Sequence, residues 1–140
     1  MMKSKINELV VYTDGASRGN PGSAGIGIVI CDKNGNTIES YYKYIGITTN
    51  NVAEYEALVA ATELVKKYDY VTAQYYLDSE LVVKQMNGDY KVKNEKLKPL
   101  YKKVMDNISN SDCMFSHIRR ELNKEADALA KKASFMVSGS

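Results

Sequence analysis

The sequence of 140 residues lacks tryptophan and holds only two cysteines, two prolines and one histidine. Cys31 and Cys113 stand alone, so they form neither a disulfide framework nor the paired spacing of a zinc site. Two buried, inert thiols in a reducing, cytoplasmic setting are therefore expected. His117 is the single histidine, and the sequence offers no serine–histidine–aspartate or cysteine–histidine arrangement that predicts a covalent nucleophile.

Long apolar runs are missing as well. No stretch approaches the roughly 18 apolar residues of a membrane-spanning helix, and residues 1–5 lead into an alternating polar segment instead of a secretion signal. No internal repeat or Pro/Gly-rich linker divides the chain. These absences predict a single domain over residues 1–140 without a membrane partner, with flexible ends at 1–6 and 134–140.

The net charge of +2 says little about partners, but its distribution is uneven. Between Lys84 and Lys103 there are seven lysines against two acids, Asp89 and Glu95. Such an excess fits either a footprint for a phosphate backbone or a solvated helix face, and the sequence leaves both alternatives open.

Hydrophobic periodicity predicts an α/β domain with a mixed sheet. Strands are expected at 9–13, 26–30 and 37–44, with a glycine-rich turn over 15–25 and a tight turn at Asn34-Gly35. Helices and strands then alternate; the expected ranges are a helix at 51–67, a strand at 71–77, helices at 80–86 and 99–108, a strand at 113–118 and a last helix from Asn123. Asn51, Ser79 and Asn123 are the expected N-caps.

Asp14 and Asp78 both stand where a predicted strand ends. Ligands of open α/β sheets gather at the carboxyl ends of strands, which favours a functional role for these aspartates. An aspartate at a strand end is also a common turn former, so for either residue alone the structural alternative stays open.

Glu54 is more informative, because its surroundings distinguish two roles. Its place three residues after Asn51 allows a capping box. Glu54 also shares its helical line with Leu58, Ala61 and Val65, which predicts that it faces the sheet. An inward carboxylate needs hydrogen bonds, a cation or a proton.

Asp127 lies in the first turns of the last helix, where a favourable interaction with the helix dipole is the simplest explanation. If the strand ends of Asp14 and Asp78 are neighbours, and the helices of Glu54 and Asp127 pack over them, four negative charges converge. Such a cluster repels itself unless divalent cations occupy it. Oxygen ligands alone favour Mg²⁺ or Mn²⁺ over zinc.

Four blocks of the sequence resemble those of type 1 ribonucleases H. In chain order they are TDGASRGNPG at 13–22, TTNNVAEY at 48–55, Asp78-Ser79 with the apolar helix that follows, and NKEADALA at 123–130. Four blocks in order over nearly the whole chain make the resemblance specific. It implies an α/β ribonuclease H-like fold: a five-stranded mixed sheet, three antiparallel strands and then parallel ones, flanked by helices.

The resemblance implies a metal-dependent endoribonuclease that hydrolyses the RNA strand of RNA–DNA hybrids. Asp14 would bridge two Mg²⁺ ions in the substrate complex, and Mn²⁺ is expected to substitute. Glu54 and Asp78 would complete one ion site, and Asp127 would help to hold the other. One ion would generate the attacking hydroxide and the other would stabilise the leaving 3′ oxygen, which yields a 5′-phosphate and a 3′-hydroxyl.

The resemblance also implies how the hybrid is recognised. Telling RNA from DNA requires contacts to 2′-hydroxyls, which line the wide minor groove of A-like duplexes. These contacts are expected from asparagine side chains and from backbone groups after Asp14, namely Asn20, Asn50, Asn51, Gly15, Ala16 and Ser17. Thr49 matches a residue that holds a phosphate of the DNA strand. Apart from the family pattern, turn asparagines and a helix N-cap are the alternative.

Two features depart from many family members. The short link 119–123 has no histidine-bearing loop and resembles a subgroup in which an arginine at the position of Arg120 is proposed to substitute. Since a guanidinium does not shuttle protons at neutral pH, Arg120 would act on phosphate or metal geometry. His117, inside a predicted strand, is the weaker candidate. The segment 88–99 is also too short for a long basic handle; a reduced version is expected from Tyr90, Lys91 and Lys93.

The expected protein is thus a monomeric ribonuclease H without base specificity. A related nuclease that cuts mainly double-stranded RNA or structured DNA is one alternative. The nuclease domain of a larger reverse transcriptase is another. A non-catalytic hybrid-binding module is the third, and the presence of all four carboxylates disfavours it.

Overall fold

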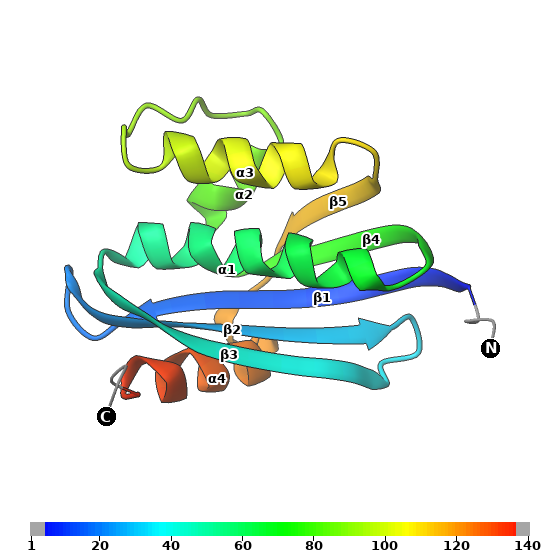
Figure 1. Cartoon of the computed structure of the whole chain (residues 1–140), viewed down its shortest axis with the longest axis horizontal. Helices are drawn as coiled ribbons and strands as arrows, with labels where there is room; N and C mark the ends of the chain where they lie inside the picture. Colours follow the sequence, from blue (N-terminus) through cyan, green and yellow to red (C-terminus); the bar gives the residue numbers. More distant parts are fainter. Residues whose placement is uncertain (1–4, 137–140) are drawn as a thin grey trace.

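The computed structural model describes residues 5–136, in which a five-stranded mixed sheet carries helices on both faces (Figure 1). The strand order is β3-β2-β1-β4-β5. An antiparallel meander comes first, made of β1 (Ile6–Ser17), β2 (Gly22–Asp32) and β3 (Thr37–Thr48). The parallel strands β4 (Tyr70–Leu77) and β5 (Asp112–His117) follow beside β1. The expected fold class is confirmed.

The helices divide between the two faces of the sheet. Helix α1 (Asn50–Leu64), extended by the 3-10 turn η1 (Val65–Lys67), packs on β1 and β2, and α3 (Lys98–Ile108) packs on α1. Helix α2 (Glu80–Met86) lies against β4 and β5. Helix α4 (Lys124–Ser134), preceded by η2 (Arg120–Leu122), covers the opposite face of the meander (Figure 1). None of the helices within residues 5–136 is long and apolar enough to span a membrane.

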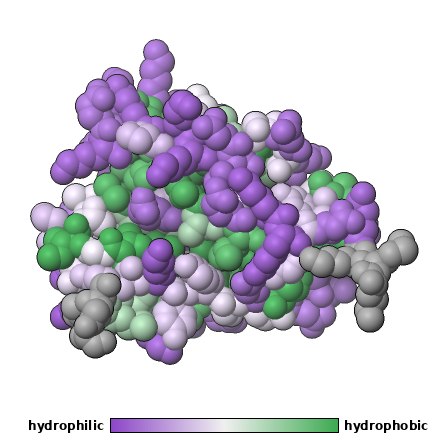
Figure 2. Space-filling view, in the orientation of Figure 1, coloured by the Kyte–Doolittle hydropathy of each residue, from purple (hydrophilic) through white to green (hydrophobic). Residues whose placement is uncertain are grey.

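The main core lies between the sheet and α1. Alternate residues of β1 such as Leu9 and Val11 are fully buried there, as the period of two in a strand requires. They meet Tyr55 and Leu58 from the inward stripe of α1. Hydrophilic residues gather on the surface around α3, in the upper part of Figure 2. The alternation in the sequence thus determines which side of β1 receives α1.

Helix α4 docks on the other face through small residues. A Cβ atom added to Gly27 of β2 would overlap the carbonyl oxygen of Ala126, so the helix lies directly on the strand backbone. Ala126, Ala130 and Ala133 of α4 are fully buried at this contact. The close approach determines where Asp127, the next residue after Ala126, is held.

A Gly27→Ala substitution is therefore expected to lower the free energy of unfolding by about 1–3 kcal/mol, because α4 must move away from β2. Urea unfolding measures the effect. Gly35→Ala is the matched control: its Cβ would meet nothing within 4 Å, so it carries only the cost of a positive φ of 88°. A Gly27→Ala protein that unfolds at the same urea concentration as the wild type would show that close packing at Gly27 is unimportant.

The glycine-rich segment after Asp14 differs from its prediction. Strand β1 continues to Ser17 and β2 begins at Gly22, so the turn covers only residues 18–21 instead of 15–25. The ladder runs without interruption from Asp14 opposite Gly27 to Ser17 opposite Ala24. Gly15 and Gly25, which indicated a turn in the sequence, serve close packing of helices on the strands instead, and the expected strand end at Asp14 is wrong.

The helix caps are partly as predicted. Ser79 caps α2 by accepting a hydrogen bond from the Val82 N–H at 3.3 Å. Thr49, and not Asn51, caps α1, because its hydroxyl oxygen accepts from the Val52 N–H at 3.2 Å. Asn123 stands at the N-cap position of α4, but its side chain makes no bond to that helix.

The predicted flexible ends overlap the fold at two residues. Ile6 begins β1 and Ser134 is buried in α4, so these two residues belong to the fold. Residues 1–4 and 137–140 lie outside the described residues. Cys31 is buried and Cys113 half-buried, and both thiols are free.

Candidate active site

Asp14 and Asp78 meet where β4 ends beside β1. Thr13 opposite Leu77 is the last pair of the parallel β1–β4 ladder. Asp14 follows the first of these residues and Asp78 the second, so the two carboxylates occupy the opening that β4 leaves at the carboxyl edge of the sheet. The predicted neighbourhood of the two aspartates is confirmed, although only Asp78 lies outside a strand.

Glu54 enters the same opening from α1. The helix approaches β1 so closely that a Cβ on Gly15 would overlap the backbone of Ala53. At this contact the Gly15 N–H donates a hydrogen bond to Glu54 Oε1 at 2.6 Å. The side chain of Glu54 is only 4% exposed, which confirms its predicted inward orientation. A capping box with Asn51 is wrong, because the carboxylate is bonded to β1.

Three carboxylates form one cluster. Asp14, Glu54 and Asp78 each offer a carboxylate oxygen, and these oxygens lie within 4.8 Å of one another. Asp127 stands at the side of this cluster and forms ion pairs with Lys131 at 3.1 Å and with Arg120 at 3.6 Å. The predicted group of four is thus a cluster of three, in which Asp14 and Glu54 are buried and Asp78 is half-buried, with Asp127 beside it.

Burial and mutual repulsion change the pKa values of the clustered carboxyl groups. Burial, and then the charges of Glu54 and Asp78, raise the pKa of Asp14 to about 11. Burial also raises the pKa of Glu54, to about 7, although Asp14 and the Gly15 N–H relieve it in part. For Asp127, partial burial opposes ionisation but is outweighed by Asp14, Lys131 and Arg120, so its pKa is lowered. A divalent cation would let all these groups ionise, which makes the donor set suited to a metal.

Asn123 is the residue that the sequence-based prediction missed. Its Nδ2 donates to the Thr13 carbonyl at 2.9 Å and to Asp78 Oδ2 at 3.0 Å, and the side chain is 1% exposed. The amide therefore holds Asp78 against β1 across the opening. The sequence signal for a role at the site was the position of Asn123 in the NKEADALA block, four residues before Asp127. The local pattern favours an N-cap at that position, so this signal was interpreted as a cap.

The residues expected to recognise a hybrid lie close to this cluster. Gly15, Ala16 and Ser17 line the same cavity as Asp14 and Glu54, as does Asn50. A neighbouring groove is lined by Asn20, Thr49, Asn50 and Asn51. Asn20 Oδ1 accepts from the Asn50 N–H at 3.0 Å, which joins the β1–β2 turn to the beginning of α1.

The remaining predicted residues separate into two groups. Arg120 lines the carboxylate cavity, whereas His117 ends β5 and is not among the residues that line it. Tyr90 and Lys91 line a different cavity, next to α2 and α3, and Lys93 follows in the same exposed segment. Lys84 Nζ lies 4.9 Å from the centroid of the Tyr90 ring. The expected basic segment is therefore a second surface, apart from the carboxylates.

Comparisons with known proteins place this geometry in a family. Residues 12–133 match the family described as reverse transcriptase-like. Ribonuclease HI of Halobacterium salinarum is 37% identical over 123 residues, which cover 87% of this chain and 62% of that protein. The solved structure of LC11-RNase H1 in complex with an RNA/DNA hybrid is 46% identical with a TM-score of 0.86, and the match covers 89% of this chain and 95% of that one. The chain belongs to the ribonuclease H family.

Within the ribonuclease H family this chain corresponds to a compact domain. A bifunctional protein of Mycobacterium tuberculosis is 39% identical over 128 residues, but the chain spans only 35% of its length. The cluster of Asp14, Glu54 and Asp78 is the acidic, metal-binding cluster typical of ribonuclease H. The resemblance in the four sequence blocks is thereby confirmed as family membership.

Proposed function

We propose that this chain hydrolyses the RNA strand of RNA–DNA hybrids as a metal-dependent endonuclease without base specificity. The observation that carries the proposal is the cluster of Asp14, Glu54 and Asp78, in a chain 46% identical to LC11-RNase H1, whose structure holds an RNA/DNA hybrid. We propose that the protein acts as a monomer in the cytoplasm, a reducing compartment that agrees with its two free thiols.

The donor set supports a pair of Mg²⁺ ions in the substrate complex, with Mn²⁺ as a substitute, because its ligands are all carboxylate oxygens. Asp14 stands centrally and would be the shared ligand. Glu54 and Asp78 would complete one ion site, and Asp127 would serve the other. When bound, the ions supply the attacking hydroxide and stabilise the leaving 3′ oxygen, which gives a 5′-phosphate and a 3′-hydroxyl.

The chain's own groups hold these ligands in place. The Gly15 N–H orients Glu54, and the Asn123 amide orients Asp78. Arg120, whose side chain is 68% exposed, would turn from Asp127 towards a substrate phosphate. Because a guanidinium stays protonated at neutral pH, its proposed work is orientation and charge, and not proton transfer.

Recognition of the hybrid is proposed for the groove next to the cluster. Asn20 Oδ1 accepts a hydrogen bond from the Asn50 N–H, so the NH₂ group of Asn20 remains to donate to a 2′-hydroxyl. Asn50, Asn51 and backbone groups of Gly15, Ala16 and Ser17 would add contacts to the same groove. Thr49 accepts from Val52 and keeps its own O–H for a phosphate of the DNA strand. Tyr90, Lys91 and Lys93 would contact the duplex farther away.

The test compares matched substrates. Purified protein with Mg²⁺ is expected to cut the labelled RNA strand of a hybrid at least about tenfold faster than RNA in a double-stranded RNA, and EDTA is expected to stop cleavage. Mass spectrometry of the products should find 5′-phosphate ends. Faster cleavage of double-stranded RNA would favour the related nuclease, and binding without cleavage would favour the non-catalytic module.

A further inference from the structure

An arginine and a phenylalanine form a pair at the rim of the carboxylate cavity. Arg18 comes from the β1–β2 turn and Phe135 follows the last residue of α4, and both line the cavity that holds Asp14 and Glu54. The Arg18 Cζ lies over the Phe135 ring, 4.0 Å from its centroid. The ring is 64% exposed, so burial of apolar surface does not explain its position.

The base of Arg18 is held by the turn. Its N–H donates to the Ser23 carbonyl at 2.9 Å, and the neighbouring Ser17 hydroxyl donates to the Thr48 carbonyl at 3.0 Å. On the other side of the turn, Asn20 is bonded to Asn50. With the backbone held by these bonds and the side chain by the ring, the guanidinium is positioned before any ligand arrives.

The guanidinium of Arg18 has no hydrogen-bond partner in the part of the chain that the structure describes. Arg18 carries five N–H groups, and its side chain makes no hydrogen bond or ion pair with any residue between 5 and 136. The other two cations of the cavity differ, because Lys131 and Arg120 are both paired with Asp127. A positioned guanidinium with free donors suits a planar or tetrahedral oxyanion, above all a phosphate.

We propose that Arg18, held over Phe135, binds a phosphate of the RNA strand adjacent to the scissile one. The proposal rests on the proposed function, since the strand that crosses Asp14 is then the RNA strand. Thr49, in the neighbouring groove, is proposed to hold a phosphate of the DNA strand, whereas Arg18 lines the cavity of Asp14 and Glu54, which the scissile RNA strand must cross. Arg18 is thus a substrate-binding residue that positions the RNA strand.

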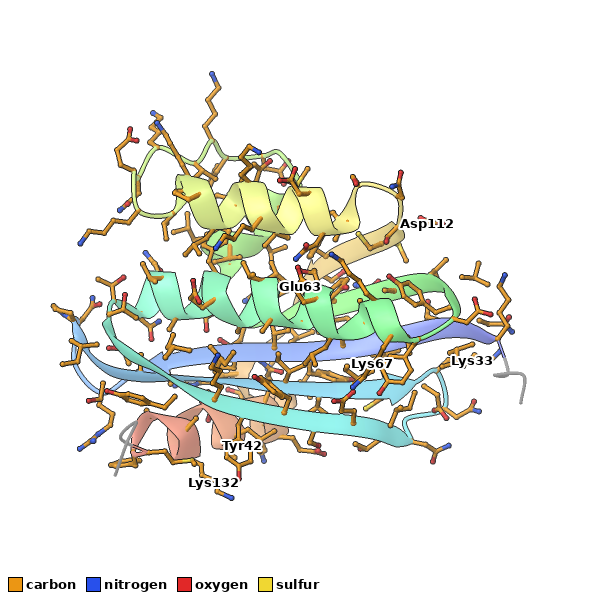
Figure 3. All side chains as sticks on the ribbon, viewed as in Figure 1. Lys33, Tyr42, Glu63, Lys67, Asp112 and Lys132 are labelled. Atoms are coloured by element: carbon orange, nitrogen blue, oxygen red, sulfur yellow. The ribbon has the colours of Figure 1, made fainter. Side chains whose placement is uncertain are left out.

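Helix α4, which directly precedes Phe135, also offers a matched control. Lys132 Nζ lies 4.7 Å from the centroid of the Tyr42 ring, a second cation–aromatic pair, whose two members Figure 3 labels. Neither Lys132 nor Tyr42 lines the carboxylate cavity. Lys132→Ala therefore removes one positive charge and one such pair without touching the proposed strand path.

The experiment measures hybrid cleavage by the wild type, Arg18→Ala, Phe135→Ala and Lys132→Ala at several salt concentrations. Arg18→Ala is expected to raise KM about tenfold with kcat within about twofold, and to reduce the slope of log affinity against log salt by about one. Phe135→Ala should raise KM about threefold and keep the slope, because the charge remains. Lys132→Ala should keep KM within about twofold of the wild type.

A hybrid with one neutral methylphosphonate linkage next to its main cleavage site tests the strand and the position. The linkage is placed in turn at each phosphate of the RNA strand near that site. In one of these hybrids, the KM of Arg18→Ala should equal that of the wild type. If no neutral linkage in the RNA strand removes the difference, or if Arg18→Ala behaves like Lys132→Ala, the proposal is overturned. A loss of kcat at unchanged KM overturns it too. Failure of the wild type itself to cut hybrid refutes the proposed function instead.

Discussion

Replacement of Asp14 by asparagine is expected to lower kcat for hybrid cleavage by at least about a thousandfold, since metal catalysis contributes several kcal/mol. Asp14 is the member of the cluster that interacts with all three of the other carboxylates, because Glu54, Asp78 and Asp127 each raise its pKa. Asparagine keeps the shape of the side chain but removes the charge that a shared ligand needs. Single-turnover cleavage of a labelled hybrid in Mg²⁺ measures the loss.

The matched control for this variant is Asp106→Asn. Asp106 is an exposed aspartate of α3 whose nearest partner is Lys102 at 3.4 Å, so its loss should leave cleavage unchanged. Hybrid binding by Asp14→Asn should persist, because the proposed contacts to 2′-hydroxyls and phosphates come from other residues. Activity of Asp14→Asn within about tenfold of the wild type would rule out a shared ligand at this position.

In metal-free buffer the same substitution is expected to stabilise the protein by roughly 2–5 kcal/mol at pH 8, a shift of about 5 °C or more in Tm. The pKa of Asp14 is raised to about 11 and that of Glu54 to about 7, in both cases chiefly by burial. In the unfolded chain both groups ionise near pH 4. Above that pH the folded state binds more protons than the unfolded state, so the free energy of unfolding falls as pH rises.

Asparagine is neutral at every pH, so Asp14→Asn escapes most of this loss. The two proteins should have similar stability near pH 4 and diverge towards pH 8, as measured by urea unfolding in EDTA. Mg²⁺ should then stabilise the wild type, because a ligand of the folded state favours folding, and should do so much less for the variant. A variant that is less stable than the wild type at pH 8 in EDTA would contradict the charge repulsion inferred at the cluster.

Much of the fold and part of the site follow from local pattern in the sequence. A period of two defines the buried side of β1, and a helical period turns Glu54 towards the sheet beside Leu58 and Ala61. Ser79 after Asp78 marks the end of a strand and the beginning of a helix. Such features depend on residues within a few positions of each other, so the sequence alone determines them.

The opening that holds the cluster depends on contacts between distant segments. Only the tertiary structure decided that β1 continues past Asp14 to Ser17, because the length of a strand depends on pairing partners far away in sequence. The same holds for Asn123, a helix cap by its local pattern, whose amide bonds Thr13 and Asp78 instead. A glycine, too, indicates a turn or a close approach equally well, until the helix that packs on it is known.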